Sequence, residues 1–201
     1  MKSTKQMIKA IIFDCFGVLV RDSLGPFYAK HMRGDTEKIR IADIEVEKSN
    51  EGIISYGEFV NRLSEISGID DGVVRYELSI NPRNEQLLEL ISEKLHGQYK
   101  IGLLSNASEN WISELFTSQN IELFDDIVLS YEVQIIKPDV KIFQLASKRL
   151  GVDTDECIFV DDLEKYLIGA REAGMKTILF KDTEQFKREL ETMLSDWDRD
   201  Y

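Results

Sequence analysis

Six polar residues of this sequence stand at the ends of short apolar runs or one loop beyond them, and they are Asp14, Ser105, Asn106, Lys137, Asp161 and Asp162. Carboxylates, hydroxyls and ammonium groups are the side chains that act as nucleophiles, bind hard cations and hold anions. Each residue alone is a weak signal, because an aspartate after a strand is often a helix N-cap. Their placement after successive apolar runs indicates a functional site.

The apolar runs that carry these residues have the length of strands, and they lie within residues 9–20, 99–106, 126–133, 157–162 and 176–182. They are rich in Ile, Val, Leu and Phe and lack polar alternation, which is typical of strands buried on both faces of a parallel sheet. In open α/β sheets, ligands bind at the carboxyl ends of the strands. We therefore expect the six polar residues to meet at that edge of the sheet.

Helical patterns separate the runs, at residues 83–97, 108–121, 138–151 and 165–174. Strands that alternate with helices predict an α/β fold, a doubly wound, Rossmann-like parallel sheet. The helix over residues 108–121 is expected to begin at Ser108, its N-cap. Trp111 and Phe124 are expected to pack in the core.

The segment after the first run has a different pattern. Residues 23–82 contain almost no strand-like run, and their short amphipathic stretches are broken by glycines. This pattern predicts a small α-helical cap inserted after the first strand. The expected domains are an α/β core of residues 1–22 and 83–201 and a helical cap of residues 23–82.

Composition limits the classes of partner. The chain has 201 residues, 43% of them hydrophobic, and a formal net charge of -12, which argues against nucleic acid or an anionic membrane surface as a partner. No apolar run is long enough to span a membrane, and the first residues do not resemble a signal peptide, so we expect a cytoplasmic protein. A phosphorylated metabolite is compatible with the charge, because a bound cation and local bases can reverse the field inside a pocket.

Four motifs span residues 11–180, and they read FDCFGVLV, LLSNAS, IIKPDVKIFQLASKRLG and CIFVDDLEKYLIGAREAGMKTILF. In this order and combination they resemble the haloacid dehalogenase-like (HAD) hydrolase superfamily. The helical insert resembles the small cap of subfamily I, a phosphatase-rich subgroup that includes sugar-phosphate phosphatases.

The resemblance implies a catalytic role for several motif residues. Asp14 would attack phosphorus and form an aspartyl-phosphate, which splits hydrolysis into two steps. Ser105, with the backbone N–H groups around Asn106, would hold the phosphoryl oxygens. Lys137 would neutralise the nucleophile and the transferring group.

The resemblance also implies a Mg²⁺ site, whose oxygen ligands would come from Asp14, the backbone carbonyl of Phe16, Asp161 and Asp162. Asp162 is the expected direct ligand, and Asp161 would act directly or through water. The cation would offset the repulsion between Asp14 and a phosphate dianion.

Phe16 departs from the superfamily pattern. Most of its phosphatases have an aspartate two residues after the nucleophile, which protonates the leaving oxygen and then activates water. Phenylalanine cannot do this, so leaving groups that need little protonation, such as anomeric or acyl phosphates, should be favoured. Asp22 and His31 are candidates for assisting the second step, and one of the cap's basic side chains could clamp the substrate; these are Lys30, Arg33, Lys38, Arg40 and Arg62.

The predicted function is a Mg²⁺-dependent phosphatase of a small phosphorylated metabolite, such as a sugar phosphate. Two alternatives to it stay open. A 2-haloacid dehalogenase has an aromatic residue at the position of Phe16, but it needs no metal and lacks the acid pair of FVDD. A non-catalytic phospho-ligand binding protein would fit two further departures, Gln134 and Tyr166, but would not need the full set of polar residues. The oligomeric state and the cap residues that select the substrate also stay open.

Overall fold

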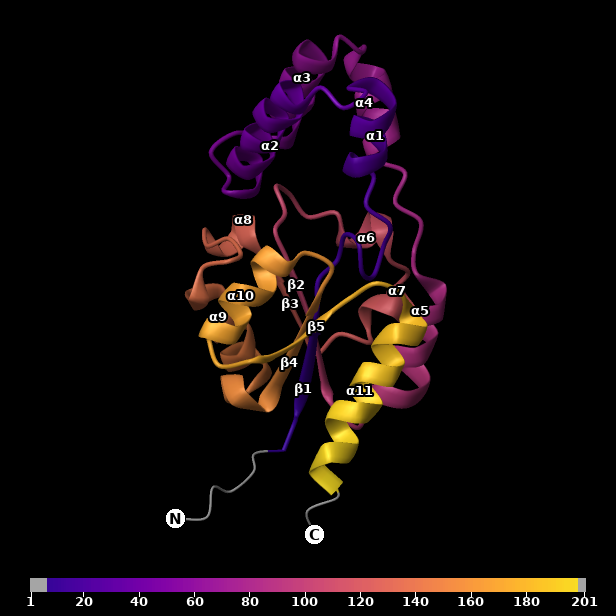
Figure 1. The fold of residues 1–201 in the computed structure, drawn as a ribbon, viewed down its shortest axis with the longest axis vertical. Helices are drawn as coiled ribbons and strands as arrows, with labels where there is room; N and C mark the ends of the chain where they lie inside the picture. Colours follow the sequence, from indigo (N-terminus) through magenta and orange to yellow (C-terminus); the bar gives the residue numbers. More distant parts are fainter. Residues whose placement is uncertain (1–6, 199–201) are drawn as a thin grey trace.

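A computed structural model describes residues 7–198 and contains a five-stranded parallel sheet flanked by helices (Figure 1). The strand order is β3-β2-β1-β4-β5. The strands are β1 Ala10–Phe13, β2 Lys100–Ser105, β3 Asp126–Leu129, β4 Cys157–Asp161 and β5 Lys176–Leu179. The predicted doubly wound α/β fold is confirmed. The outermost residues of the predicted core, 1–6 and 199–201, lie outside the described residues.

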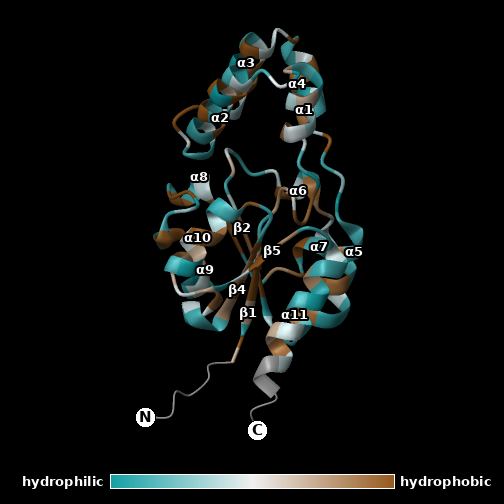
Figure 2. Ribbon diagram, viewed as in Figure 1, coloured by the Kyte–Doolittle hydropathy of each residue, from teal (hydrophilic) through white to brown (hydrophobic). Residues whose placement is uncertain are grey.

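The sheet is buried on both faces, as its apolar runs predict. On β1, Ile11 and Phe13 face one hydrophobic cluster, and Ala10 and Ile12 face the other. Helices α5 (Glu85–Leu90) and α11 (Thr183–Asp198) supply side chains to the first cluster, and α9 (Val140–Leu150) and α10 (Glu164–Glu172) supply the second. Figure 2 shows the resulting apolar centre between helices whose outer faces are polar. The side chains of β1 thus alternate between the two faces of the sheet, and each face is covered by one layer of helices.

Several predicted elements are shorter than their apolar runs. The first strand ends at Phe13, because the carbonyl of Cys15 accepts hydrogen bonds from the N–H groups of Leu19 and Val20 (2.9 Å each) and closes a tight turn. The third run leaves the sheet at Leu129 and continues as α8, Ser130–Val133. Helix α5 continues as one π-helical turn, Ile91–Leu95, and a 3₁₀ turn, Thr154–Glu156, precedes β4.

The single helix predicted over residues 108–121 is wrong. Two short helices form there, α6 (Ile112–Leu115) and α7 (Ser118–Ile121). Phe116 between them is extended, with its ring against Phe124, and Thr117 begins α7 with a capping box. Ser108 is therefore not an N-cap, whereas Phe124 is in the core as predicted.

Four helices follow β1, and they are α1 Leu24–His31, α2 Thr36–Asn50, α3 Tyr56–Ser67 and α4 Asp71–Leu78. They pack around a hydrophobic cluster of their own, which includes Phe27, Val60 and Leu63. In Figure 1 they lie beyond the carboxyl ends of the strands. We call them the cap helices; the domain boundaries at residues 22/23 and 82/83 stay a prediction.

The cap helices are joined to the core by two neighbouring segments. The N–H of Arg21 donates to the carbonyl of Pro82, and the N–H of Asn84 donates to the carbonyl of Leu19 (2.9 and 2.8 Å). The chain thus enters and leaves the cap side by side.

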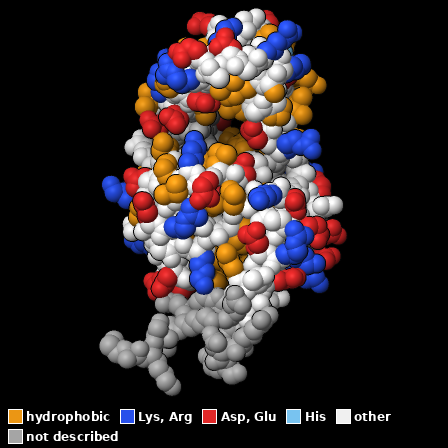
Figure 3. Space-filling view, viewed as in Figure 1, with side chains coloured by type: hydrophobic (Ala, Val, Ile, Leu, Met, Phe, Trp, Pro, Cys, Tyr) orange, Lys and Arg blue, Asp and Glu red, His pale blue; other side chains and the backbone are white. Residues whose placement is uncertain are grey.

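Acidic and basic side chains are interspersed over the face drawn in Figure 3. Among residues 7–198, no helix has the length and apolar character that a membrane span requires.

Candidate active site

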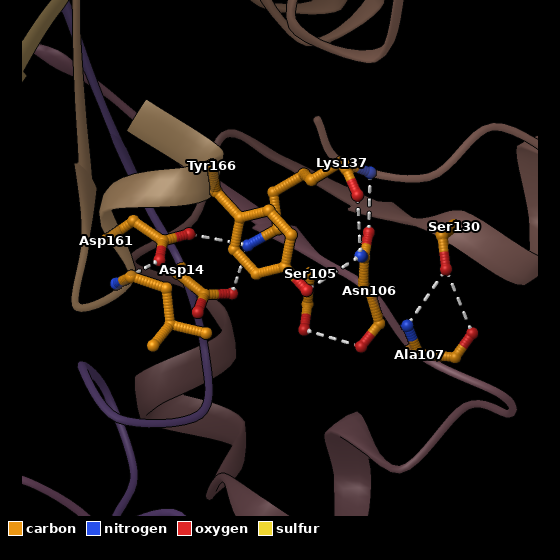
Figure 4. Close-up of polar contacts among 9 residues, drawn as sticks. Asp14, Ser105, Asn106, Ala107, Ser130, Lys137, Asp161 and Tyr166 are labelled. Atoms are coloured by element: carbon orange, nitrogen blue, oxygen red, sulfur yellow. Dashed lines mark hydrogen bonds and ion pairs between the residues drawn. The ribbon is translucent and has the colours of Figure 1, made fainter. Parts of the chain in front are cut away.

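The carboxyl end of the sheet holds the polar residues singled out from the sequence (Figure 4). Asp14 follows β1, Ser105 ends β2 and Asp161 ends β4, while Lys137 reaches the same place from the loop after α8. These four residues are buried, with exposed fractions of 6% or less. The structure therefore brings together the residues that the strand-end pattern predicts to meet.

Lys137 lies at the centre of this group. Its Nζ donates to Oδ1 of Asp14 at 2.7 Å and to Oδ2 of Asp161 at 2.8 Å. Burial alone would lower the pKa of Lys137, but the charges of the two carboxylates outweigh it and hold the pKa above its usual value. Burial raises the pKa of Asp14 to about 7, against the opposing effect of the Lys137 charge. The lysine is therefore a fixed ammonium group that stabilises the ionised form of Asp14.

Asn106 fixes the loop that carries the lysine. Its Oδ1 accepts from the backbone N–H of Lys137 at 2.8 Å, and its Nδ2 donates to the carbonyl of Lys137 at 3.1 Å. The side chain is thus used for positioning. The neighbouring Ser105 lines the cavity described below, and its hydroxyl makes only a long bond, 3.3 Å, to the carbonyl of Asn106. This leaves the Ser105 hydroxyl free to turn toward a ligand.

Ser130 ties the same loop to the cap. Its hydroxyl accepts from the N–H of Ala107 at 2.9 Å. Its single proton lies within reach of two carbonyl oxygens, that of Ala107 at 3.1 Å and that of Asn50, at the end of α2, at 2.8 Å. No sequence pattern distinguishes Ser130, since it is a serine at the start of a short helix.

The three carboxylates have the arrangement of a cation site. One ligand oxygen from each of Asp14, Asp161 and Asp162 lies within 4.8 Å of the others. Both Asp161 oxygens have donors, from Lys137 and from the N–H of Leu163, whereas Oδ1 of Asp162 is buried without a hydrogen-bond partner. A buried carboxylate oxygen without a donor is costly unless a cation meets it. The donor set therefore fits Mg²⁺, with Asp162 as the open ligand.

Burial, together with the charge of Asp161, raises the pKa of Asp162 to about 6. Gly17 explains how this carboxylate comes so close to the turn after β1. Gly17 has a φ of 88°, and a Cβ added there would lie 2.3 Å from Oδ2 of Asp162. Only a glycine permits both the turn and the approach of the carboxylate.

Phe16 forms part of the wall of the site and has no group that could react. Its ring lies edge-on to Trp111, with centroids 4.8 Å apart and an interplanar angle of 70°. Both rings line a cavity of about 530 Å³ between the sheet edge and the cap helices. Trp111, expected in the core, does pack against the core cluster, but it is only partly buried and its ring also lines the cavity.

The two candidates for replacing the missing acid have other partners. Asp22 lines the cavity, but its two carboxylate oxygens accept from the N–H groups of Leu24 (3.2 Å) and Gly25 (2.8 Å) at the start of α1. His31 is not among the cavity residues; its Nε2 lies 2.9 Å from Glu77. The structure thus places only Asp22 at the cavity and leaves both roles unsupported.

None of the five basic cap residues named from the sequence lines the cavity. Three of them pair with acids of the cap: Lys30 with Glu77, Arg40 with Glu37 and Arg62 with Glu45. Arg75 of α4 lines the cavity instead, with its guanidinium 5.6 Å from the ring centroid of Tyr56. No sequence signal separates Arg75 from the other cap bases, because the orientation of α4 decides it.

Comparison with known proteins places this site in a family. A glyceraldehyde 3-phosphate phosphatase of Methanopyrus kandleri is 36% identical over 83 residues, 40% of this chain and 35% of that protein. A phosphatase of Mycobacterium tuberculosis is 39% identical over 83 residues, 40% of this chain and 38% of that protein. The chain thus matches less than two fifths of the length of these relatives.

A HAD family enzyme of Bacteroides thetaiotaomicron, solved in complex with magnesium and inorganic phosphate, is 26% identical. It superposes with a TM-score of 0.68 over 88% of this chain and 96% of its own. The family model for haloacid dehalogenase-like hydrolases matches residues 8–174. The chain belongs to the haloacid dehalogenase-like hydrolase family.

Proposed function

We propose that this chain is a Mg²⁺-dependent phosphatase that hydrolyses a small phosphorylated metabolite through an aspartyl-phosphate on Asp14. The observation that carries the proposal is the pairing of two features at one sheet edge. Asp14 is a buried carboxylate held by an ammonium group, and beside it Asp162 has a buried oxygen without a donor. The first feature suits a nucleophile, and the second suits a cation that binds phosphate oxygens.

The residues of the chain divide the work of phosphoryl transfer. Lys137 holds Asp14 in place and supplies positive charge where negative charge develops. The Ser105 hydroxyl donates to a phosphoryl oxygen, and Asn106 keeps the lysine loop in position. Asp14, Asp161, Asp162 and the carbonyl of Phe16 would hold Mg²⁺, which offsets the repulsion between the carboxylates and a phosphate dianion.

The cap helices set the size of the substrate. A cavity of about 530 Å³ lies within the range of small-molecule sites. Closure of the cap over the sheet edge would exclude bulk water from the first step and select the substrate. A small phosphorylated metabolite fits this space.

The named relatives support the same reaction. Two curated relatives carry phosphatase names, one of them for glyceraldehyde 3-phosphate. The Bacteroides enzyme binds magnesium and inorganic phosphate, the cation and the product that the proposal requires.

Phosphate release from a panel of phosphorylated metabolites, with Mg²⁺ or with a chelator, tests the proposal. We expect release that needs Mg²⁺ and that falls at least about 10³-fold in Asp14→Asn, whose amide keeps the shape but cannot form the intermediate. Thermal unfolding of the variant checks that the fold is kept. Wild-type turnover in Asp14→Asn would refute the assignment of the nucleophile.

Phe16 favours one second candidate, a 2-haloacid dehalogenase, because halide leaves without a proton. The open oxygen of Asp162 counts against it, since that reaction needs no metal. Halide release from 2-haloacids in the presence of chelator, without phosphate release from the panel, would establish the second candidate in place of the first.

A further inference from the structure

We propose that the substrate is an aryl phosphate, the phosphate ester of a planar and acidic hydroxyl, rather than the phosphate of an aliphatic alcohol such as a sugar hydroxyl. This inference rests on the proposed phosphatase function and names its substrate class. Two observations lead to it independently: the groups that stand beside the leaving oxygen, and the side chains that form the cavity walls.

The first observation is the lack of a placed proton donor next to the nucleophile. Phe16, two residues after Asp14, presents a ring to the cavity, where it packs on Trp111. The leaving oxygen must then depart as an anion. A phenolic hydroxyl ionises at a pKa of roughly 10, whereas a hydroxyl as weak as that of water has a pKa of about 15.7. An aryl oxide therefore leaves far more readily than an alkoxide.

Other acids of the cavity do not fill this role in the structure. Asp22 uses both carboxylate oxygens to accept backbone N–H groups at the start of α1. The Tyr166 ring lies 4.6 Å from Nζ of Lys137, among the groups that would hold phosphate (Figure 4). Burial raises the pKa of Tyr56, which makes it a weaker donor. Glu109 and Glu114 are exposed residues of the cavity lining.

The second observation is the aromatic character of the walls. The core contributes Phe16 and Trp111, and the cap contributes Tyr56 and Phe59, whose ring centroids lie 6.2 Å apart. A planar ring can stack on such faces or meet their edges. Polar side chains line the cavity as well, among them Ser49 and Asn81, whose side-chain oxygens have no partner and can bind polar substituents of the leaving group. The four rings therefore match a planar leaving group, the same class that the missing acid requires.

The reaction balances without a protein acid. A carboxylate oxygen of Asp14 forms a bond to phosphorus while the bond from phosphorus to the aryl oxygen breaks. The electron pair of that bond stays on the aryl oxygen, which takes its proton from water. Water then attacks the aspartyl-phosphate, loses a proton to solvent, and releases inorganic phosphate and the Asp14 carboxylate.

A set of matched substrates separates the leaving-group effect from the wall effect. Phenyl and cyclohexyl phosphate have rings of similar size, but only the first is planar and has an acidic hydroxyl. Acetyl phosphate has a good leaving group without a ring. With Mg²⁺, we expect kcat/KM for phenyl phosphate to exceed that for cyclohexyl phosphate at least about 100-fold, the typical contribution of a general acid. We also expect phenyl phosphate to exceed acetyl phosphate.

Equal rates for phenyl and cyclohexyl phosphate would overturn the inference and leave the phosphatase standing, because some acid of the cavity would then protonate the leaving oxygen. A preference for acetyl phosphate over phenyl phosphate would likewise overturn it. Release of phosphate from the metabolite panel but from none of the three compounds would also overturn the inference, whereas release from neither set would overturn the proposed function itself. The two failures are thus distinguishable within one assay.

Variants test each observation separately. Phe16→Asp should raise the rate with cyclohexyl phosphate relative to phenyl phosphate at least about tenfold, because it restores a proton donor, while Phe16→Leu should not change that ratio. Trp111→Leu should raise KM for phenyl phosphate about tenfold, and raise KM for acetyl phosphate much less. Phe124→Leu is the control, since it removes a core ring that does not line the cavity. Equal losses for both substrates in Trp111→Leu would overturn the wall assignment.

Discussion

The sheet edge and the cap helices face the same cavity with opposite chemistry. At the sheet edge, charged groups are buried and bonded to one another, as in the contacts of Lys137 with Asp14 and Asp161. In the cap, the ion pairs that involve Lys30 and Arg62 lie away from the cavity and remain partly exposed, whereas the cavity receives two rings, aliphatic side chains and mostly uncharged polar groups. This difference agrees with the proposed roles, in which groups of the core react with the phosphate and the cap contacts the leaving group.

The largest difference between the two regions should appear in the free energy of unfolding when one basic side chain is removed from each. Lys137→Met leaves two buried carboxylates without their partner, and we expect it to lower the free energy of unfolding by about 3–5 kcal/mol. Arg62→Met removes a cap cation whose side chain is 40% exposed, and we expect a loss below about 1 kcal/mol. Urea unfolding in chelator measures both, and similar losses would contradict the contrast between buried and solvated pairs.

Two glycines with positive φ, one at the sheet edge and one in the cap, allow the two regions to be compared by the same substitution. Gly17→Ala and Gly34→Ala impose similar strain, since their φ values are 88° and 79°, but a Cβ meets Asp162 only at Gly17 and has no neighbour within 4 Å at Gly34. We expect Gly17→Ala to weaken Mg²⁺ binding about tenfold or more, because it displaces a ligand. Gly34→Ala should cost only about 1 kcal/mol of stability. Mg²⁺ titrations and urea unfolding of both variants measure the two effects. Equal Mg²⁺ affinities would show that the contact with Asp162 is unimportant.

Ser130 joins the two regions, and its loss should lower both stability and activity. Ser130→Ala removes the bond to Asn50 of the cap and leaves the N–H of Ala107 buried without a partner, at a cost of about 1–3 kcal/mol. We expect kcat/KM to fall about tenfold, because the loop of Ser105 and Asn106 loses its support. Ser147→Ala is the matched control, a buried serine of α9 that bonds only within its helix. Steady-state kinetics of the two variants would refute this coupling if they gave the same loss.

The smallest expected effect is the pH dependence of the stability that one cap residue, Glu45, contributes. Bonds from Lys48 and Arg62 lower the pKa of Glu45 below its usual 4.5, so the ionised form stabilises the folded state above that pH. This contribution is lost as pH falls through the lowered pKa. We expect Glu45→Gln to be less stable than the wild type by under about 1 kcal/mol at pH 7, with the difference shrinking as pH falls through the lowered pKa. Urea unfolding as a function of pH measures it, and a difference that does not shrink as the pH is lowered would assign the effect to packing.

The sheet edge could be predicted from the sequence because two simple rules combine there. Apolar runs of strand length identify parallel strands, and parallel strands bring the residues at their carboxyl ends to one edge. Asp14, Ser105, Asp161 and Asp162 follow directly from these rules. Lys137 follows from the motif, since a loop separates it from β3.

The cap wall could not be predicted in the same way. Helical periodicity shows which side chains are apolar, but it does not show whether they also face a cavity, and so it predicts the core contact of Trp111 but not its place in the cavity wall. The position of Arg75 depends on how α4 is oriented over the sheet, which is a tertiary property. The split of residues 108–121 into two helices follows from the burial of Phe116 in an extended conformation, and no local propensity signals it.

The neighbouring segments that connect cap and core have a consequence for how this chain can change over generations. Arg21, in the segment that enters the cap, bonds to Pro82 in the segment that leaves it, and Asn84 in the leaving segment bonds back to Leu19. Both ends of the insert are therefore anchored at one point of the core. An insert of another length or shape can replace residues between these anchors without moving β1 or α5. Mutation and recombination can thus exchange the cap helices while the polar groups at the sheet edge are inherited unchanged.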